Sequence, residues 1–182
     1  MTTFQIDPAH TEIGFSARHM MVTNVRGKFT DVRGSVDFDE ADPTRSTAEI
    51  VIGAASIDTG VGPRDAHLRS GDFLDAEQHP ELVIRTTRIT PRSGGRYSVT
   101  ADATVRGVTR PVELDAELLG FYTSMQGARR VGVSARTTIN RKDWGLDWNV
   151  ALETGGWLVS EQIAFEIELA LEETAAAAAD AA

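Results

Sequence analysis

Apolar and polar residues alternate through eight segments of this chain, and this alternation constrains the fold more than any other feature. A period of two puts successive side chains on opposite faces of an extended strand, one toward a core and one toward water. Gly, Pro, Asp and Asn separate the segments, as is typical of turns. The predicted strands are residues 11–21, 25–38, 45–55, 81–89, 96–107, 111–122, 129–141 and 159–171.

Short links join most neighbouring segments and favour antiparallel pairing, as at Ser93-Gly94-Gly95. Eight antiparallel strands can close into a barrel, so we predict an all-β fold with this architecture. At 182 residues the chain suits one domain, which we assign to residues 1–172. Residues 173–182 are mostly Ala, and we expect them to form a disordered tail or a frayed helix.

The connection between the third and fourth predicted strands holds a short helical insertion. Pro63 is placed to begin a helix and Gly71 to end it. In one interpretation Leu68 packs inward and the polar residues cap backbone groups at the mouth of the barrel. In the other, Arg64, Asp65 and His67 form a chemical site.

The alternation also predicts which apolar side chains point into the barrel. Several inward positions are small, such as Ala17 and Gly27, which favours an internal cavity. Small residues also fit the taper of a packed barrel, so the sequence is compatible with an internal cavity and with a packed core. With the apolar residues of the insertion and Trp144, the predicted ligand-binding set is Ile13, Phe15, Ala17, Val25, Phe29, Ile50, Ile52, Leu68, Phe73, Leu82, Ile84, Val99, Val105, Leu114, Val133, Ile139, Trp144, Ile163 and Phe165.

Trp144 follows a predicted strand in a glycine-containing loop. Its indole either plugs an open end of the barrel or forms part of a ligand wall. We expect Trp148 and Trp157 to line either the mouth of the barrel or a dimer interface, and both roles are compatible with the sequence.

Composition excludes several kinds of function. The chain has no cysteine, which rules out disulfides, thiolate metal sites and thiol nucleophiles. Its net charge of −9, with scattered basic residues, argues against nucleic acid as a partner. The start lacks a basic leader, and no apolar run approaches the roughly 20 residues of a membrane-spanning helix. We therefore expect a cytoplasmic protein that does not span a membrane.

Signals for catalysis and metal binding are weak. The four histidines show neither the i, i+4 nor the close H-x-H spacing of familiar zinc ligands, and no Gly-x-Ser-x-Gly turn or phosphate-binding glycine loop is present. We predict no enzyme, no metal and no cofactor other than a bound lipid. The polar residues with possible head-group or structural roles are His10, His19, Arg64, Asp65 and His67.

Several longer segments together resemble the YceI-like family. The resemblance covers about Phe4 to Leu171 in the family's order and spacing, which makes it more specific than a single motif. It is carried by residues 6–20, 25–29, 56–59 and 64–68, by Val105-Arg106-Gly107-Val108-Thr109 and by Ile139-Asn140-Arg141-Lys142-Asp143-Trp144-Gly145. Two departures are the missing secretion signal that many members carry and Thr11, where the family usually has serine.

The resemblance implies an elongated barrel similar to lipocalins, with an apolar tunnel that holds a polyisoprenoid, a quinone tail, a fatty amide or a similar chain. It also implies a homodimer. We thus predict non-enzymatic binding, transport or storage of a long apolar chain, whose burial supplies about 25 cal/mol per Å². Two alternatives remain: a metal-binding or hydrolase-like protein centred on the histidines and the insertion, and a ligand-free, stress-linked interaction module.

Overall fold

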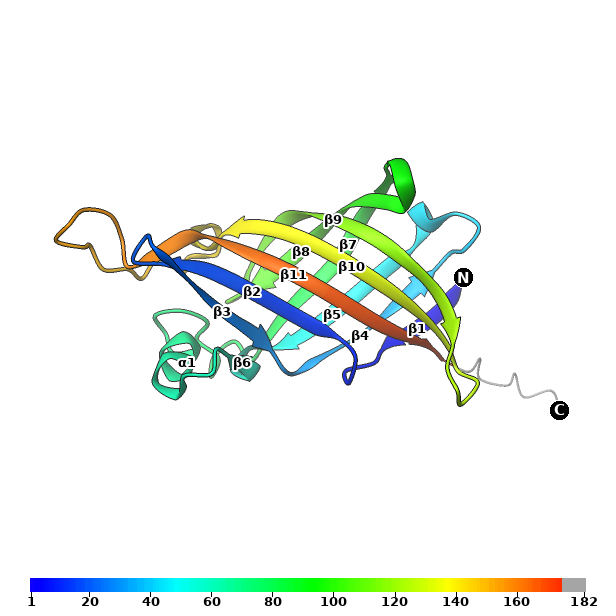
Figure 1. Ribbon diagram of the computed structural model, residues 1–182, viewed down its shortest axis with the longest axis horizontal. Helices are drawn as coiled ribbons and strands as arrows, with labels where there is room; N and C mark the ends of the chain where they lie inside the picture. The colour runs from blue at the N-terminus through cyan, green and yellow to red at the C-terminus, as the bar shows by residue number, and fades with distance from the viewer. Residues whose placement is uncertain (175–182) are drawn as a thin grey trace.

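The computed structural model describes residues 1–174 and shows an elongated β-barrel with one α-helix beside one end (Figure 1). The strands are β1 (Thr2–Ile6), β2 (Glu12–His19), β3 (Thr23–Phe29), β4 (Val32–Phe38), β5 (Thr47–Gly53), β6 (Ile57–Asp58), β7 (Glu81–Pro91), β8 (Arg96–Val105), β9 (Val108–Thr123), β10 (Arg129–Asn140) and β11 (Val159–Glu173). The helix is α1 (Gly62–Arg69), and four short 3₁₀ helices are η1 (Pro43–Arg45), η2 (Ala54–Ser56), η3 (Ser93–Gly95) and η4 (Arg141–Trp144).

The sheet closes on itself through antiparallel pairs. The ring runs β1-β4-β5-β7-β8-β9-β10-β11 and returns to β1 through the pairing of β1 with β11. This confirms the predicted eight-stranded antiparallel barrel. The long β11 pairs with β1 through residues 171–173 and with β2 through residues 159–168, so β1 and β2 share one position in the wall.

The segment predicted as one strand over residues 25–38 is two strands, which corrects that prediction. β3 pairs with β2 and β6, whereas β4 pairs with β1 and β5. The wall turns a corner between them, where Thr30 N donates to Ser56 O at 3.3 Å and Gly53 N donates to Asp31 O at 2.9 Å. Alternation continues through the corner, so the pattern alone does not reveal it.

Two other differences lie near the N-terminus. β1 was not predicted, although Phe4 and Ile6 alternate and are buried, because five residues are short for a strand signal. The strand predicted over residues 11–21 ends at His19, since Met20 and Met21 have φ of 49° and 63° and form the turn into β3. Left-handed backbone of this kind belongs to turns rather than strands.

The helical insertion lies between β6 and β7, where it was expected. Pro63 is in the first turn of α1, and the helix ends at Arg69, with Ser70 N donating to His67 O at 3.1 Å. It therefore ends two residues before the predicted stop at Gly71. At the other boundary, Glu173 still belongs to β11, which shortens the predicted tail of residues 173–182; residues 175–182 lie outside the described residues.

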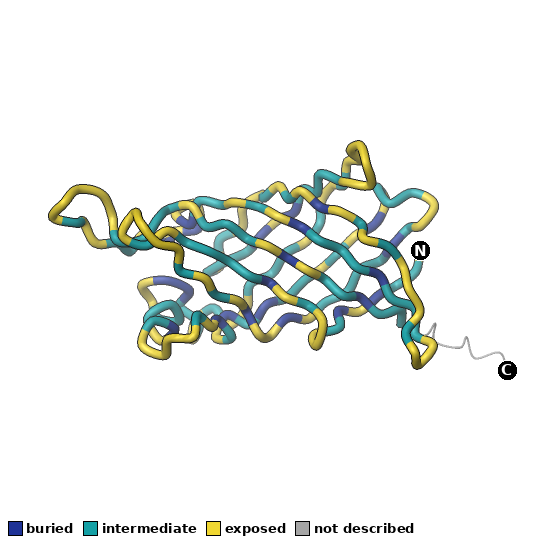
Figure 2. The backbone as a smooth tube through the Cα atoms, viewed as in Figure 1, coloured by how far each residue is buried: buried dark blue, intermediate teal, exposed yellow. Residues whose placement is uncertain are grey.

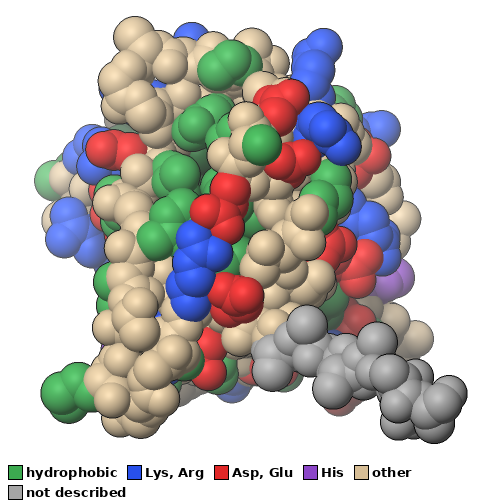
Figure 3. Space-filling model, turned by 90° about the vertical axis from the view of Figure 1, so that its right-hand side faces the viewer, with side chains coloured by type: hydrophobic (Ala, Val, Ile, Leu, Met, Phe, Trp, Pro, Cys, Tyr) green, Lys and Arg blue, Asp and Glu red, His purple; other side chains and the backbone are tan. Residues whose placement is uncertain are grey.

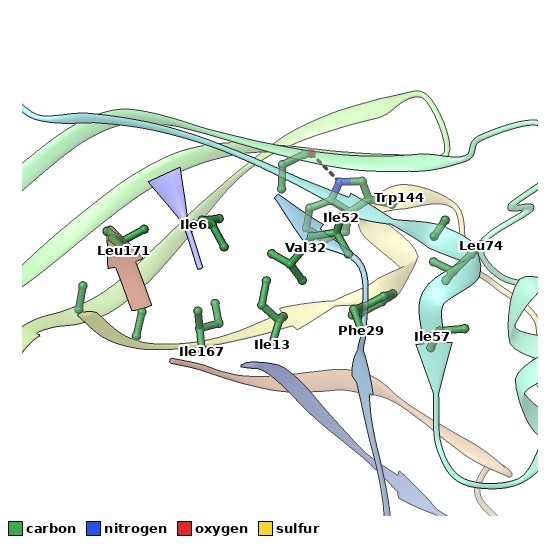
Figure 4. Close-up of a cluster of buried hydrophobic side chains, with 14 of the residues drawn as sticks. Ile6, Ile13, Phe29, Val32, Ile52, Ile57, Leu74, Trp144, Ile167 and Leu171 are labelled. Carbon is green, nitrogen blue, oxygen red and sulfur yellow. Dashed lines mark hydrogen bonds between the residues drawn. The ribbon is translucent and has the colours of Figure 1, made fainter. Parts of the chain in front are cut away.

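The half of the barrel near β1 is packed with side chains. Phe4, Ile13, Val131 and Leu171 have at most 2% of their surface exposed. The ring of Phe4 meets that of Phe38 edge-on, with centroids 6.5 Å apart. Figure 4 shows the buried side chains following one another through the barrel, from Leu171 and Ile6 toward Ile57 and Leu74. Close apolar packing therefore holds this half of the barrel together.

Ion pairs surround the packed end. Arg129 donates to both carboxylate oxygens of Glu40, at 2.6 and 2.7 Å, and Arg130 lies 3.0 Å from Asp7. Figure 3 faces this end and shows basic and acidic side chains beside each other on its surface. Within residues 1–174 no helix is both long and apolar enough to cross a bilayer.

A glycine pair tests the close packing of β3 against β2 and β6. A Cβ at Gly27 would lie 2.5 Å from Phe15 Cζ and 2.9 Å from the backbone oxygen of Asp58, whereas a Cβ at Gly14 meets nothing closer than 3.6 Å. We expect Gly27→Ala to lower the free energy of unfolding by about 1–3 kcal/mol because backbone must move. Gly14→Ala, the matched control, is expected to change it by less than about 0.5 kcal/mol. Urea unfolding measures both, and equal stability of the two variants would contradict this packing.

Candidate functional site: an apolar cavity

A cavity of about 440 Å³ occupies the half of the barrel opposite the packed end. Its walls come from β2, β3, β6, β7, β8, β10 and β11, and α1 with the segment after it, η4 and the loop of residues 145–158 complete them. Two lining residues, Arg18 and Pro63, are exposed, so the cavity reaches the surface beside α1. The interior is thus packed in one half and hollow in the other.

Alternation predicted many of the cavity walls. Ala17 and Val25 illustrate this, because they are paired across β2 and β3 and both face the cavity. The predicted apolar residues that line it are Phe15, Ala17, Val25, Phe29, Leu68, Phe73, Leu82, Val105, Ile139, Trp144, Ile163 and Phe165. The predicted polar residues that line it are His19, Arg64 and His67.

The remaining predicted apolar residues point inward but belong to the core around the cavity or in the packed half. They are Ile13, Ile50, Ile52, Ile84, Val99, Leu114 and Val133. Contact of a bound chain with these seven residues stays a prediction. Among the polar residues, His10 lies on the exposed turn after β1, and Asp65 is the buried residue of α1 but does not line the cavity.

Part of the wall comes from apolar residues outside the predicted ligand-binding set, in β6, α1, the segment after α1, the loop after η4 and the start of β11. Trp148, for which a mouth or a dimer interface was considered, is one of them, and the others are Ile57, Pro63, Leu74, Leu146, Leu158 and Val159. Trp148 packs against the insertion, with its ring centroid 4.5 Å from that of His67 and 5.4 Å from that of Phe73. The loop after η4 shows no regular alternation of apolar and polar residues, so only its tryptophans indicated that it packs against the barrel.

Trp144 lines the cavity and is almost fully buried. Its indole N–H donates to Ala103 O at 2.9 Å, and only 4% of the residue is exposed (Figure 4). One face of the ring can fill the barrel interior while the hydrogen bond fixes its orientation. The two roles considered for this residue are therefore compatible.

Polar side chains fasten the insertion to the barrel through backbone groups. Asp65 accepts hydrogen bonds from Thr59 N at 2.9 Å and Thr59 Oγ1 at 2.5 Å. Arg69 donates to Ala55 O at 2.7 Å and Ile57 O at 2.8 Å. Arg64 donates to Thr59 Oγ1 at 2.7 Å and Thr59 O at 3.1 Å. These contacts agree with the capping interpretation of the insertion.

The environment of Asp65 favours its ionised form. Burial alone would raise the pKa of its carboxyl group, but the hydrogen bonds from Thr59 and the charges of Arg69 and Arg64 hold that pKa below its usual value. The carboxylate therefore stabilises the fold at neutral pH.

His19 and His67 line the same cavity, but the histidines of residues 1–174 do not gather into a metal site. His67 Nε2 lies 2.8 Å from Asp72 Oδ2, and His10 Nδ1 lies 2.8 Å from Asp7 Oδ2 in a different part of the molecule. Within residues 1–174 no three His, Asp or Glu side chains are grouped closely enough to hold a metal ion.

Arg141 is the most deeply buried cation of the cavity wall, with 4% of its surface exposed. Its Nε donates to Ser160 O at 2.9 Å, and its Nη1 donates to Leu146 O at 2.5 Å and Trp148 O at 2.9 Å. Burial lowers its pKa, although Glu161 and Asp147 oppose this shift. The guanidinium thus ties the loop after η4 to β11.

Exposed apolar side chains surround the cavity end of the barrel. Met20, Met21 and Val22, in the turn between β2 and β3, are 50%, 63% and 74% exposed, and Trp157 is 53% exposed. The turn and the loop are joined by a hydrogen bond from Met20 N to Leu158 O at 2.8 Å. In Figure 2 both segments project beyond the barrel and consist largely of exposed residues.

The fold and the cavity define a closed antiparallel β-barrel with an apolar internal site at one end. The chain belongs to the YceI-like family, whose domain matches residues 4–171. It is 34% identical over 169 residues to a UPF0312 protein of Staphylococcus aureus strain N315, covering 91% of this chain and 95% of that protein. This confirms the family predicted from the sequence.

Solved structures share the fold. A YceI protein of Campylobacter jejuni is 26% identical, with a TM-score of 0.75 over 87% of this chain and 90% of that one. A polyisoprenoid binding domain from Saccharophagus degradans is 15% identical, with a TM-score of 0.68 over 96% of this chain and 99% of that one. The lipocalin-like barrel expected from the resemblance is thus found in these relatives of known structure.

Removing the charge of Asp65 tests the anchor of the insertion. Asp65→Asn is expected to lower the free energy of unfolding at neutral pH by about 1–2 kcal/mol, since hydrogen bonds to a charged group are replaced by neutral ones. The pKa of Asp65 in the folded protein lies below its value of about 3.9 in the unfolded chain. The wild type is therefore more stable than Asp65→Asn by the full amount above about pH 3.9, and this difference in free energy of unfolding is lost as pH falls through the folded-state pKa.

Urea unfolding at neutral pH and at the lowest pH that retains the fold measures this difference. Asp102→Asn, which removes an exposed carboxylate on β8, serves as the control. A stability gap between wild type and Asp65→Asn that stays constant across this range would contradict the assignment.

Proposed function

We propose that this protein binds a long apolar chain, a polyisoprenoid or an isoprenoid-tailed quinone, in the cavity of its barrel and carries or stores it without chemical change. The observation that supports the proposal is the apolar cavity of about 440 Å³, which reaches the surface beside α1. Aliphatic and aromatic side chains form most of its wall. Such a wall suits a ligand recognised by its apolar surface and shape rather than by many hydrogen bonds.

The energetics of burial agree with a flexible, branched hydrocarbon. Moving apolar surface out of water contributes about 25 cal/mol per Å², so a chain that fills the cavity gains affinity over its whole length. Phe15, Phe165 and Trp148 offer flat aromatic faces, while Val25 and Leu68 offer branched aliphatic ones. Cavity length and width then limit which chains fit.

Similar proteins give this proposal a second support. The family membership rests on nearly the whole length of the chain, and one structural neighbour is described as a polyisoprenoid binding domain. That neighbour shares 15% of its residues with this chain, so it supports the choice of ligand class only through the common fold. Transport rather than storage, location in the cytoplasm and assembly as a homodimer stay predictions.

A cavity-filling substitution tests the proposed site. Ala17→Trp places a large ring in the cavity wall, next to Val25 on the adjacent strand. Ser16→Trp introduces the same ring at the neighbouring position, which does not line the cavity. A ligand that binds only the folded state stabilises it, by about 2.7 kcal/mol at a concentration of 100 times Kd. We expect a prenyl alcohol to raise the melting temperature of the wild type and of Ser16→Trp but not of Ala17→Trp.

Circular dichroism of both variants checks that the barrel is intact. An equal rise in melting temperature for Ala17→Trp and the wild type would place the ligand elsewhere, and no rise in the wild type would contradict the proposed function itself.

A further inference from the structure

The end of the barrel where β2 turns into β3 carries a group of exposed apolar side chains. Eleven large apolar side chains are exposed within residues 1–174, and five of them lie in the β2–β3 turn and the loop of residues 145–158. We call these five the apolar tip: Met20, Met21, Val22, Val150 and Trp157. Single exposed apolar residues are ordinary, but a group on two adjacent segments marks a surface that an apolar partner covers.

The fold does not require methionine in this turn. Met20 and Met21 have φ of 49° and 63°, a left-handed conformation that glycine, asparagine and aspartate adopt more readily. Both side chains are nevertheless long and apolar, and at least half of each residue's surface is exposed. They contribute neither to the turn geometry nor to the hydrophobic core, which indicates a role outside the barrel.

Hydrogen bonds join the turn and the loop into one unit. Met20 N donates to Leu158 O at 2.8 Å, and Leu158 N donates to Val150 O at 2.9 Å. Met21 Sδ lies where a Cβ of residue 156 would be, so side chains also bridge the two segments. Figure 1 shows both segments projecting from the same end of the barrel. Backbone groups that are paired in this way cost less to move out of water than unpaired ones.

The charge beside the turn has the opposite sign from that of the whole chain. The net charge of the chain is −9, with 27 acidic residues. Residues 13–30 nevertheless contain Arg18, Arg26 and Lys28 and no carboxylate. Arg18 Nη1 donates to Val22 O at 3.2 Å, which places this cation at the turn itself, and Arg26 is exposed on β3. The β2–β3 hairpin is therefore suited to an anionic surface.

The loop contributes two exposed carboxylates, Asp147 and Glu153. The charge of Asp147 acts on the buried guanidinium of Arg141, whose pKa it raises against the effect of burial. Glu153 lies at the far end of the loop, in a turn closed by a hydrogen bond from Gly155 N to Leu152 O at 3.0 Å. Glu153 is thus the charge of the loop that opposes contact with an anionic surface.

We propose that the apolar tip docks onto the surface of a lipid bilayer that contains anionic lipids. Met20, Val22 and Trp157 enter the boundary between head groups and acyl chains, a region in which tryptophan is enriched. Arg18 and Arg26 face the lipid phosphates. This inference goes beyond the proposed function and does not depend on it, because the five residues of the tip do not line the cavity.

The position of the tip gives docking a consequence for the cavity. Arg18 and His19 directly precede the turn, and Leu158 directly follows Trp157. Arg18, His19 and Leu158 all line the cavity. A docked tip therefore brings this part of the cavity wall up to the bilayer, in which a long apolar chain dissolves.

Flotation of the full chain with lipid vesicles tests the inference. Vesicles of phosphatidylcholine alone, and of phosphatidylcholine with an equal part of phosphatidylglycerol, separate apolar insertion from charge. We expect the protein to float with the mixed vesicles, to float less with phosphatidylcholine, and to be partly released from the mixed vesicles by added salt. Protein that stays in solution with both kinds of vesicle would overturn the inference, whereas uptake of a prenyl alcohol by that same protein would leave the proposed function intact.

A substitution in the turn locates the apolar contact. Met20→Asn keeps a residue that tolerates left-handed backbone and removes an apolar side chain, so affinity for the mixed vesicles is expected to fall about fivefold. Met125→Asn is the matched control, because Met125 is fully exposed in the turn between β9 and β10, at the other end of the barrel. Equal losses in the two variants would overturn the assignment to the tip.

Charge substitutions test the choice of an anionic surface. Arg26→Gln is expected to weaken binding to the mixed vesicles about fivefold, and Glu153→Gln is expected to strengthen it by a similar factor. Arg88→Gln is the control, since Arg88 is exposed on β7 and lies outside the hairpin and the loop. If neither Arg26→Gln nor Glu153→Gln differs from Arg88→Gln, the anionic surface is the wrong partner.

A second copy of this chain is the rival occupant of the tip. Sedimentation velocity without vesicles examines it by comparing the wild type with Met20→Asn. We expect the two proteins to have the same oligomeric state. A dimer of the wild type that Met20→Asn dissociates would assign the tip to self-association and overturn docking on a bilayer.

Discussion

The closed ring of backbone hydrogen bonds is the constraint on which the rest of this structure depends. β11 is long enough to pair with β1 at one end and β2 at the other, so two short strands complete the wall that a single strand fills elsewhere. Closure removes the strand edges of the eight-stranded ring, whereas β3 and β6 branch from β2 and end the sheet next to α1. One end of the barrel is packed by side chains such as Phe4 and Leu171. The other is covered by α1 and the loop after η4, and the cavity lies beneath them.

Polar contacts to backbone groups hold these two covering segments in place. Asp65 and Arg69 bind the chain around η2 and β6, and Arg141 binds carbonyl oxygens of the loop and of β11. These hydrogen bonds fix α1 and the loop after η4 at the border of the barrel end. The space that they enclose therefore need not be filled by side chains for the two segments to stay in place. The cavity therefore depends on directional contacts at its border, whereas the opposite half depends on close apolar packing.

Alternation predicted the barrel and most of the strand-borne cavity wall, because inward and outward faces follow directly from a period of two. Phe15, Ala17 and Val25 were found in this way. The same pattern cannot tell how far along a strand the packing ends, so Ile84 and Val133 were grouped with residues that line the cavity. Two other features arise only when the sheet closes, and no local pattern encodes them. They are the corner at Thr30 and Asp31 and the position of Trp148 and Arg141 in the cavity wall.

Native mass spectrometry of the protein purified without detergent, followed by solvent extraction, shows whether the barrel carries a ligand. We expect one long apolar chain per barrel, lost on extraction and identified by its mass, because a cavity lined by Phe15, Leu68 and Trp148 favours such a chain over water. Protein that carries no such mass, and takes up none when prenyl lipid is added, would contradict the proposed binding of an apolar chain.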